Sequence, residues 1–280
     1  AASYARRVIT PTVFHVPSPA AVPAGEVPVL EDSSFLADPP SVPSVPGQRT
    51  ADVTADAHDA DGAPQAPPGL SLWLVNVVEE AEAAAALAPS VLDAAEQKRV
   101  AAFYRAKDSR SYRSAHVALR LLLGARLGVP PETVEFVREV CPTCGELHGR
   151  PAVAGGGLHF SLSHSGELAL IGMAPVTVGV DVEETPKPSV ATDTARMLHP
   201  RETAELDALS DDARVDAFGR AWVRKEAYLK ALGTGLSRSL ALDYMGTGAS
   251  PAQDLPGWTL TDIRVPQGYL AAAAIRSEPR

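Results

Sequence analysis

Gly179-Val180-Asp181-Val182-Glu183 is the stretch of sequence on which the interpretation of this chain depends. Side chains alternate between the two faces of a strand, so Asp181 and Glu183 share one face. Paired carboxylates suit Mg²⁺, which takes one or two of them and completes its shell with water and phosphate oxygens. An isolated Asp-x-Glu is more often the solvated end of an edge strand, because charged side chains are usually exposed. The pair therefore needs partners elsewhere in the chain.

A second stretch about forty residues later offers such partners. It reads Trp222-Val223-Arg224-Lys225-Glu226-Ala227-Tyr228-Leu229-Lys230 and is typical of a helix. Glu226 and Lys230 are four residues apart and share one helix face. A surface ion pair worth about 0.2 to 0.5 kcal/mol explains that spacing equally well. Charged and aromatic side chains around much of the circumference favour a helix that faces a substrate.

Composition limits the class of protein. A chain of 280 residues, 45% of them hydrophobic, can bury the core of one large domain or two small ones. The net charge of -9 argues against a general nucleic-acid binder. Prolines interrupt residues 8–22, and no apolar run approaches the roughly 18 residues of a membrane span, so we expect neither secretion nor membrane insertion. The one pair of cysteines suits a reducing cytoplasm.

The chain divides into three parts. Residues 1–69 hold twelve of the 25 prolines and an excess of acidic residues, so we expect a disordered extension. Residues 70–173 and 174–280 each mix strands with helices, which predicts an α+β protein of two comparable halves. We expect strands over residues 70–78, 133–140, 158–163, 168–171, 177–183, 240–244, 258–265 and 269–275. We expect helices over residues 94–104, 191–197, 202–209 and 212–232, and another that begins at the N-cap Asp108 and ends before Gly128.

Other motifs carry weaker signals. Ser163-His164-Ser165-Gly166 lies where a strand gives way to a turn, and its hydroxyl, imidazole and backbone N–H groups suit a phosphate. It lacks the Gly-x-Ser-x-Gly elbow of an α/β-hydrolase, and a serine-rich turn without a role is the alternative. Cys141-Pro142-Thr143-Cys144 with His148 supplies at most three ligands where a closed zinc site needs four, so two reduced cysteines in a tight loop are the favoured interpretation.

Basic residues cluster on the two expected helices of the first half, which makes them candidates for binding an anion with several phosphates. They are Lys98, Arg99, Arg105, Lys107, Arg110, Arg113 and Arg120.

Taken in order, these segments resemble the Sfp-type 4′-phosphopantetheinyl transferases. The likeness spans roughly residues 70–275, and the Trp-x-x-Lys-Glu-Ala form resembles the branch that serves secondary metabolism. The matching pieces are Phe103-Tyr104 through Asp108 to Arg120, Gly149-Arg150-Pro151, Phe160 to Gly166, Gly179 to Glu183 and Trp222 to Ala231. Ser111 departs from the pattern, since relatives often carry arginine there.

The resemblance implies a pseudo-dimer of two α+β halves in one chain, with coenzyme A bound in the cleft between them. It implies Mg²⁺-dependent transfer, with Mn²⁺ as an alternative, of 4′-phosphopantetheine from coenzyme A to a serine of an acyl or peptidyl carrier protein. The products would be the holo carrier, of the polyketide or nonribosomal-peptide kind, and 3′,5′-ADP. We expect a monomer, because two fused halves already supply the cleft.

The resemblance also implies roles for single residues. Asp181, Glu183 and Glu226 would bind the metal, and Glu226 would also act as base, directly or through water. Lys225 and Lys230 would hold the pyrophosphate, with Lys230 at the leaving group. The nucleotide and its 3′-phosphate would meet Arg150, Pro151, Ser163 and His164, with Arg99 and Arg110 as further candidates.

Two other readings stay open at the level of sequence. One is a coenzyme A or nucleotide-binding regulatory module without turnover. The other is a zinc-stabilised interaction protein centred on Cys141 and Cys144.

Overall fold

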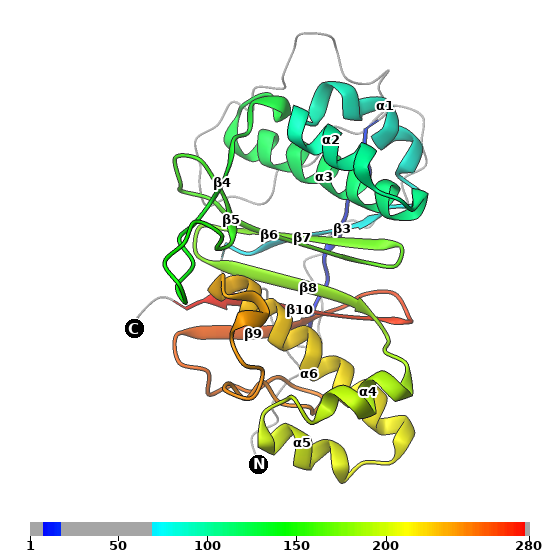
Figure 1. Cartoon of the computed structure of the whole chain (residues 1–280), viewed down its shortest axis with the longest axis vertical. Coiled ribbons are helices and arrows are strands. Elements are labelled where there is room, and N and C mark those ends of the chain that lie inside the picture. The colour runs from blue at the N-terminus through cyan, green and yellow to red at the C-terminus, as the bar shows by residue number, and fades with distance from the viewer. Residues whose placement is uncertain (1–7, 18–68, 278–280) are drawn as a thin grey trace, which may run out of the picture.

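The first half of the chain builds an antiparallel sheet covered on one side by helices. A computed structural model describes residues 8–17 and 69–277. In it, three strands are ordered β3-β7-β6, and α1, α2 and α3 lie across the outer face of their sheet (Figure 1). The strands are β3 (Ser71–Asn76), β6 (His159–Ser165) and β7 (Leu168–Ala174). The helices are α1 (Ala81–Val91), α2 (Ala94–Ala102) and α3 (Ala106–Leu127).

The second half repeats this arrangement. Its strands are ordered β9-β10-β8, again antiparallel, and its helices cover the opposite outer face of the molecule (Figure 1). The strands are β8 (Val178–Glu184), β9 (Trp258–Ile263) and β10 (Tyr269–Arg276). The helices are α4 (Pro188–Ala195), α5 (Pro200–Asp207) and α6 (Asp211–Leu232).

The two halves share one connectivity. In each, a strand leads through helices to a pair of strands, and the last strand lies between the other two. The longest helix of each half, α3 or α6, has 22 residues and ends at a glycine in the left-handed conformation, Gly128 or Gly233. Glycine stops a helix at this position because it adopts a positive φ without steric cost. The α+β class predicted from the sequence is therefore confirmed.

An apolar layer joins the inner faces of the two sheets. Leucines of β3 and β7 meet valines of β8 and residues of β10 there. The sheets approach closely at Gly172, where an added Cβ would lie 2.5 Å from Cγ1 of Val180. Separate cores lie under α1–α3 and under α4–α6, which gives four layers in the order helix, sheet, sheet, helix. The site described below lies where β6 and β8 face each other.

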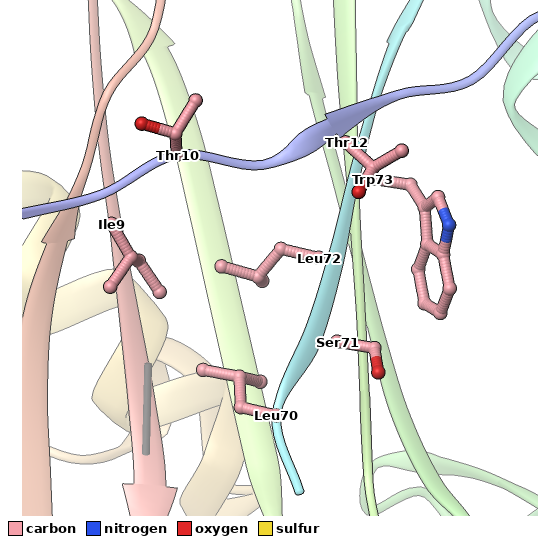
Figure 2. A pocket seen from close by; sticks show the side chains of 7 residues that line it. All are labelled: Ile9, Thr10, Thr12, Leu70, Ser71, Leu72 and Trp73. Atoms are coloured by element: carbon pink, nitrogen blue, oxygen red, sulfur yellow. The ribbon is translucent and has the colours of Figure 1, made fainter. Parts of the chain in front are cut away.

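A segment at the N-terminal end crosses from one sheet to the other. β1 (Val8–Ile9) pairs in parallel with β9, and β2 (Thr12–Val13) pairs in parallel with β3. Figure 2 shows Ile9, Leu70 and Leu72 on the same side of this crossing, where they line a small pocket. The expectation of disorder is wrong for residues 8–17, because Ile9, Phe14 and Val16 bury their side chains. Residues 1–7 and 18–68 lie outside the described residues, so the expectation there stays a prediction.

Several expected elements differ from the structure. No strand forms over residues 240–244, which are a turn, and the strand expected over 133–140 is reduced to β4 (Phe136–Arg138) after a short 3₁₀ turn, η2 (Pro131–Thr133). β4 pairs with β5 (Pro151–Val153). α3 begins at Ala106, with Arg105 rather than Asp108 at its N-cap. The alanine-rich α1 and the short 3₁₀ helix η3 (Gly235–Ser237) were not expected.

None of the helices in the described ranges is both long and apolar enough to cross a membrane.

Candidate functional site

Close contact between β8 and α6 brings together residues of the two stretches 179–183 and 222–230. A Cβ added to Gly179 would lie only 2.0 Å from the carbonyl oxygen of Ala227, so the helix rests directly on the strand. Lys230 of α6 then reaches Asp181, which lies two residues after Gly179 on β8. Glycine is required here because any side chain would push the helix away.

Asp181 is the buried centre of the site. It is 1% exposed, and its Oδ1 accepts hydrogen bonds from Ser163 Oγ at 2.8 Å and Lys230 Nζ at 2.6 Å. Its Oδ2 is buried and has no hydrogen-bond partner among the described residues. Burial raises the pKa of this carboxyl, and the charge of Lys230 opposes that rise. A buried carboxylate oxygen without a protein partner is suited to a hard cation.

Glu183 and Glu226 extend the negative charge around Asp181. Ser165 Oγ donates to Glu183 Oε2 at 2.8 Å. Burial raises the pKa of both glutamates, and repulsion from the Asp181 carboxylate raises each further. The three side chains therefore share one electrostatic environment, although their oxygens do not all lie within 4.8 Å of one another.

Serines on β6 connect this strand to β8. Ser161, Ser163 and Ser165 alternate along β6 and so share a face. Ser161 Oγ accepts from the backbone N–H of Val180, while the other two donate to the carboxylates of Asp181 and Glu183. Lys230 Nζ also donates to Ser163 Oγ at 2.8 Å, so α6, β6 and β8 meet at one point. Because β6 belongs to the first half and β8 to the second, the site lies between the halves.

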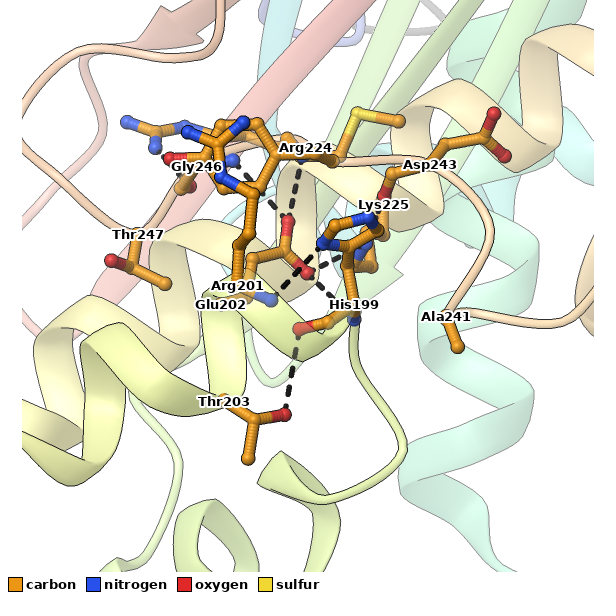
Figure 3. Close-up of polar contacts among 12 residues, drawn as sticks. His199, Arg201, Glu202, Thr203, Arg224, Lys225, Ala241, Asp243, Gly246 and Thr247 are labelled. Atoms are coloured by element: carbon orange, nitrogen blue, oxygen red, sulfur yellow. Dashed lines mark hydrogen bonds and ion pairs between the residues drawn. The ribbon is translucent and has the colours of Figure 1, made fainter.

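Lys225 is not part of this group. Its side chain is buried, pairs with Glu202 at 2.7 Å and donates to the carbonyl of Asp243 at 2.5 Å, as Figure 3 shows. Burial lowers the pKa of this lysine, and the Glu202 carboxylate counters the shift. Five residues separate it from Lys230, which at 3.6 residues per turn places the two side chains on different faces of α6. The expected contact of Lys225 with a pyrophosphate therefore has no support in its position.

Arg150 lies just before Pro151, the first residue of β5, and is held by two partners. Its Nε and Nη2 bind the Glu139 carboxylate at 2.6 and 2.8 Å, and Nη2 also lies 2.9 Å from Nδ1 of His159. Its Nη1 is buried without a partner among the described residues. The backbone at Arg150 packs against the end of α6, since a Cβ added to Gly233 would lie 3.2 Å from its nitrogen.

His164 extends the site toward the helices of the first half. Its side chain lies near the end of β6, where desolvation lowers its pKa and electrostatic interactions with His116 and Lys230 lower it further. His116 was not among the expected site residues. It follows Arg110 and Arg113 along α3 at intervals of three, a spacing that places all three on neighbouring positions of one face.

The remaining basic candidates lie on α2 and α3 or, for Arg105, at the N-cap of α3. Arg120 is fully buried and pairs with Asp93 and Glu96, so its expected contact with a phosphate is not supported. Nε of Arg110 and Nε of Arg113 are buried without partners among the described residues, so α3 presents unsatisfied guanidinium donors. Arg99 is exposed and stacks over the Phe103 ring, 5.4 Å from its centroid. Within the part of the chain that the structure describes, no hydrogen bond or ion pair joins Arg99 to Asp181, Glu183 or Glu226.

Known proteins resemble this chain over most of its described length. It is 32% identical over 194 residues to the 4′-phosphopantetheinyl transferase HetI of Nostoc sp., an alignment that covers 66% of this chain and 79% of the relative. The chain belongs to the 4′-phosphopantetheinyl transferase family. The model of the 4′-phosphopantetheinyl transferase superfamily matches residues 177–254, which contain β8 and α6 and hence all of Asp181, Glu183, Glu226 and Lys230. The family and the transferase class predicted from the sequence are confirmed.

Two further members of the family show the same likeness over a shorter span. A putative 4′-phosphopantetheinyl transferase of Synechocystis sp. is 31% identical over 54% of this chain, and a 4′-phosphopantetheinyl transferase of Bacillus subtilis is 27% identical over 54%. The chain covers 61% and 64% of these two relatives, so somewhat under two thirds of their length is matched.

Proposed function

We propose that this protein transfers 4′-phosphopantetheine from coenzyme A to a serine of an acyl or peptidyl carrier protein and releases 3′,5′-ADP. The observation that carries the proposal is the environment of Asp181. One oxygen of this buried carboxylate is bound by Lys230 and Ser163, and the other has no partner within residues 8–17 and 69–277. Two further carboxylates with raised pKa values lie beside it. We extend the family assignment to the Sfp-type branch on the Trp222-Val223-Arg224-Lys225-Glu226-Ala227 motif.

Asp181, Glu183 and Glu226 are the residues that would hold Mg²⁺ or Mn²⁺. The fit rests on chemistry, because all three offer oxygen only and Oδ2 of Asp181 lacks a partner among the described residues. Mutual repulsion among carboxylates is relieved when a cation binds between them. When bound, the metal would neutralise charge on the pyrophosphate of coenzyme A.

We assign to Glu226 the removal of the serine proton, and to Lys230 the stabilisation of negative charge on the pyrophosphate. The serine Oγ of the carrier attacks the phosphorus that bears pantetheine, and the bond from that phosphorus to the oxygen of the departing 3′,5′-ADP breaks. Glu226 takes the serine proton, directly or through water, as a general base positioned beside Asp181. Lys230, whose side chain is 32% exposed, donates to the pyrophosphate and balances charge on the leaving group.

The nucleotide would lie toward the first half. Arg150 and Arg110 carry buried guanidinium nitrogens without partners among the described residues, and these suit a phosphate. His164 with Ser163 of β6 and Pro151 of β5 would line the same region, and the exposed Arg99 would act from the rim. We assign Lys225 to the structure rather than to the pyrophosphate, because its ammonium group is committed to Glu202.

The repeated connectivity supports a pseudo-dimer in one chain, with coenzyme A between residues 70–173 and 174–280. A monomer in the cytoplasm is the state that we propose. The free thiols of Cys141 and Cys144 accord with a reducing compartment.

Intact-mass measurement of apo carrier proteins tests this function. The panel holds fatty-acid, polyketide and nonribosomal-peptide carriers, each incubated with coenzyme A and Mg²⁺. We expect the mass of at least one carrier to rise by one phosphopantetheine, and we expect Asp181→Asn and Glu226→Gln to abolish the rise. Glu184→Gln is the matched control, because Glu184 is the exposed neighbour on β8. Full activity in Asp181→Asn would contradict the proposal, and coenzyme A binding without any mass gain would favour a regulatory binding module.

A further inference from the structure

The loop between β4 and β5 has a defined shape. Backbone hydrogen bonds between Glu139 and Arg150 and between Gly149 and Glu139, at 3.1 and 2.8 Å, extend the β4–β5 hairpin to the loop's base. Inside it, the N–H of Cys141 donates to the carbonyl of Glu146 at 2.7 Å, and the N–H of Gly145 donates to the carbonyl of Cys141 at 2.8 Å. Gly145 has a φ of 82°, which permits the chain to reverse after Cys144.

This fold of the loop gathers three soft or imidazole ligands. One ligand atom from each of Cys141, Cys144 and His148 lies within 4.8 Å of the others. Sγ of Cys144 is 2.9 Å from Nε2 of His148. In residues 8–17 and 69–277 no other three Cys, His, Asp or Glu side chains place ligand atoms so close together. Cys141 is buried, whereas Cys144 and His148 are exposed, so one ligand is fixed and the site is open to solvent.

We propose that this loop binds one Zn²⁺ through Cys141 Sγ, Cys144 Sγ and an imidazole nitrogen of His148, with the fourth position open to water or an incoming ligand. Zinc prefers four tetrahedral N and S ligands. At its usual bond lengths neighbouring ligand atoms are roughly 3.5 to 3.8 Å apart, so small side-chain movements suffice. The nearby histidine favours a metal over a simple disulfide. An imidazole nitrogen can bind a metal together with the two thiolates, whereas a disulfide would leave it without a role.

The position of the loop gives the metal a structural consequence. Arg150 follows His148 by two residues and closes the hairpin through its two bonds to Glu139. Its backbone contacts the end of α6 at Gly233. A bound ion would therefore fix the loop that joins the hairpin to the second half of the molecule. The inference stands apart from the proposed transfer reaction, because no residue of the Asp181 group takes part.

Metal analysis of the full chain, purified under reducing conditions, tests the proposal. We expect one zinc per chain, and we expect titration of metal-depleted protein with Co²⁺ to give thiolate-to-cobalt charge-transfer absorption. Cys144→Ser removes one of two thiolates, so it should lower the charge-transfer absorption per bound Co²⁺ and weaken Co²⁺ binding. His148→Gln should weaken Co²⁺ binding at least about tenfold, the effect that loss of a ligand's hydrogen-bond partner typically has. Glu146→Gln is the matched control and should bind as the wild type does, because this carboxylate belongs to the same loop but not to the cluster.

Both substituted ligands are exposed, so far-ultraviolet circular dichroism should show folded protein in every variant. Reduced wild-type protein without zinc and without cobalt–thiolate absorption would overturn the proposal. Unchanged Co²⁺ affinity in Cys144→Ser and His148→Gln would overturn it as well.

Discussion

Two lysines on α6 show how the same residue type serves different purposes five positions apart. Lys225 is buried against Glu202, which is itself 0% exposed. Lys230 is partly exposed and bridges Ser163 and Asp181. The first holds α5 to α6, and the second brings positive charge to the site. The sequence motif contains both lysines, but it does not indicate which face of the helix is exposed to solvent.

Substitution of each lysine by methionine separates the two roles. Lys225→Met leaves the Glu202 carboxylate buried and unpaired, a change that typically costs about 3 to 5 kcal/mol of unfolding free energy. Lys230→Met costs less, because the raised pKa of Asp181 allows that carboxyl to bind a proton instead. We expect Lys230→Met to abolish carrier modification at a smaller loss of stability. Urea unfolding and the mass assay measure the two effects, and a larger stability loss for Lys230→Met would contradict the assignment.

The raised pKa values of Asp181, Glu183 and Glu226 predict a pH effect on stability. The folded chain holds protons on these groups more tightly than the unfolded chain does, so their contribution to stability falls as pH rises above the ordinary values of 3.8 to 4.5 and through the raised ones.

We therefore expect Asp181→Asn to gain stability relative to the wild type as pH rises through that window in a chelator. Urea midpoints at a series of pH values, with and without Mg²⁺, measure the effect, and Mg²⁺ should reduce the difference by stabilising the wild type. A pH-independent difference between the two proteins would contradict the prediction.

At the scale of elements, the contact of α6 with β8 sets the geometry of the site. Gly179→Ala would place a methyl group against the Ala227 carbonyl, at a distance that no relaxed contact allows. Overpacking of this kind typically costs about 1 to 3 kcal/mol, or more where backbone must move. We expect a lower melting temperature and a loss of transfer beyond what the fraction of unfolded protein explains.

The control for this variant is Gly248→Ala, because an added Cβ at Gly248 meets nothing within 4 Å and its φ is not positive. Its melting temperature and activity should match those of the wild type. Equal behaviour of Gly179→Ala and Gly248→Ala would show that the close contact is unnecessary.

The elements that the sequence predicted best are those with local signals. α2 begins at a capping box formed by Asp93 and Glu96, and α6 ends at Gly233, as patterns of single residues indicate. The strand predicted over residues 240–244 was wrong. Their apolar side chains belong to a turn, in which the carbonyl of Asp243 accepts a hydrogen bond from Lys225. α1 was missed because alanines carry little periodicity and Pro89 lies within the helix. These failures have tertiary causes that no local pattern contains.

In the candidate site, too, local patterns predicted some residues, while the positions of others depend on tertiary packing. The alternation on β8 put Asp181 and Glu183 on one strand face, and the four-residue spacing on α6 put Glu226 and Lys230 on one helix face. The structure brings Lys230 to Asp181, but only the resemblance implied a shared metal site, which stays a prediction. The interior position of Lys225 depends on where α5 packs, and that packing is set by residues far away in the sequence. Likewise, the β6 serines gain partners only because the two sheets face each other.

For the whole molecule, residues 8–17 connect the two sheets that form the site. Ile9 packs in the layer between the sheets, while Phe14 packs in the core beneath α1–α3. His15 Nδ1 lies 2.6 Å from Glu80 Oε1, and the N–H of Val16 donates to Oε2 of the same carboxylate at 2.8 Å. The segment therefore adds one strand to each sheet and ties its far end to the start of α1.

This arrangement predicts that both ends of the segment stabilise one cooperative structure. Ile9→Ala should cost about 2 to 5 kcal/mol and Phe14→Ala about 3 to 5 kcal/mol, because each removes a buried side chain. Val13→Ala is the control, since Val13 is 61% exposed on the outer strand β2. Calorimetry should show a single transition that moves to lower temperature in both core variants and stays in place for Val13→Ala. Two separate transitions, or an unchanged melting temperature in Ile9→Ala, would mean that the halves unfold independently and that the segment does not couple them.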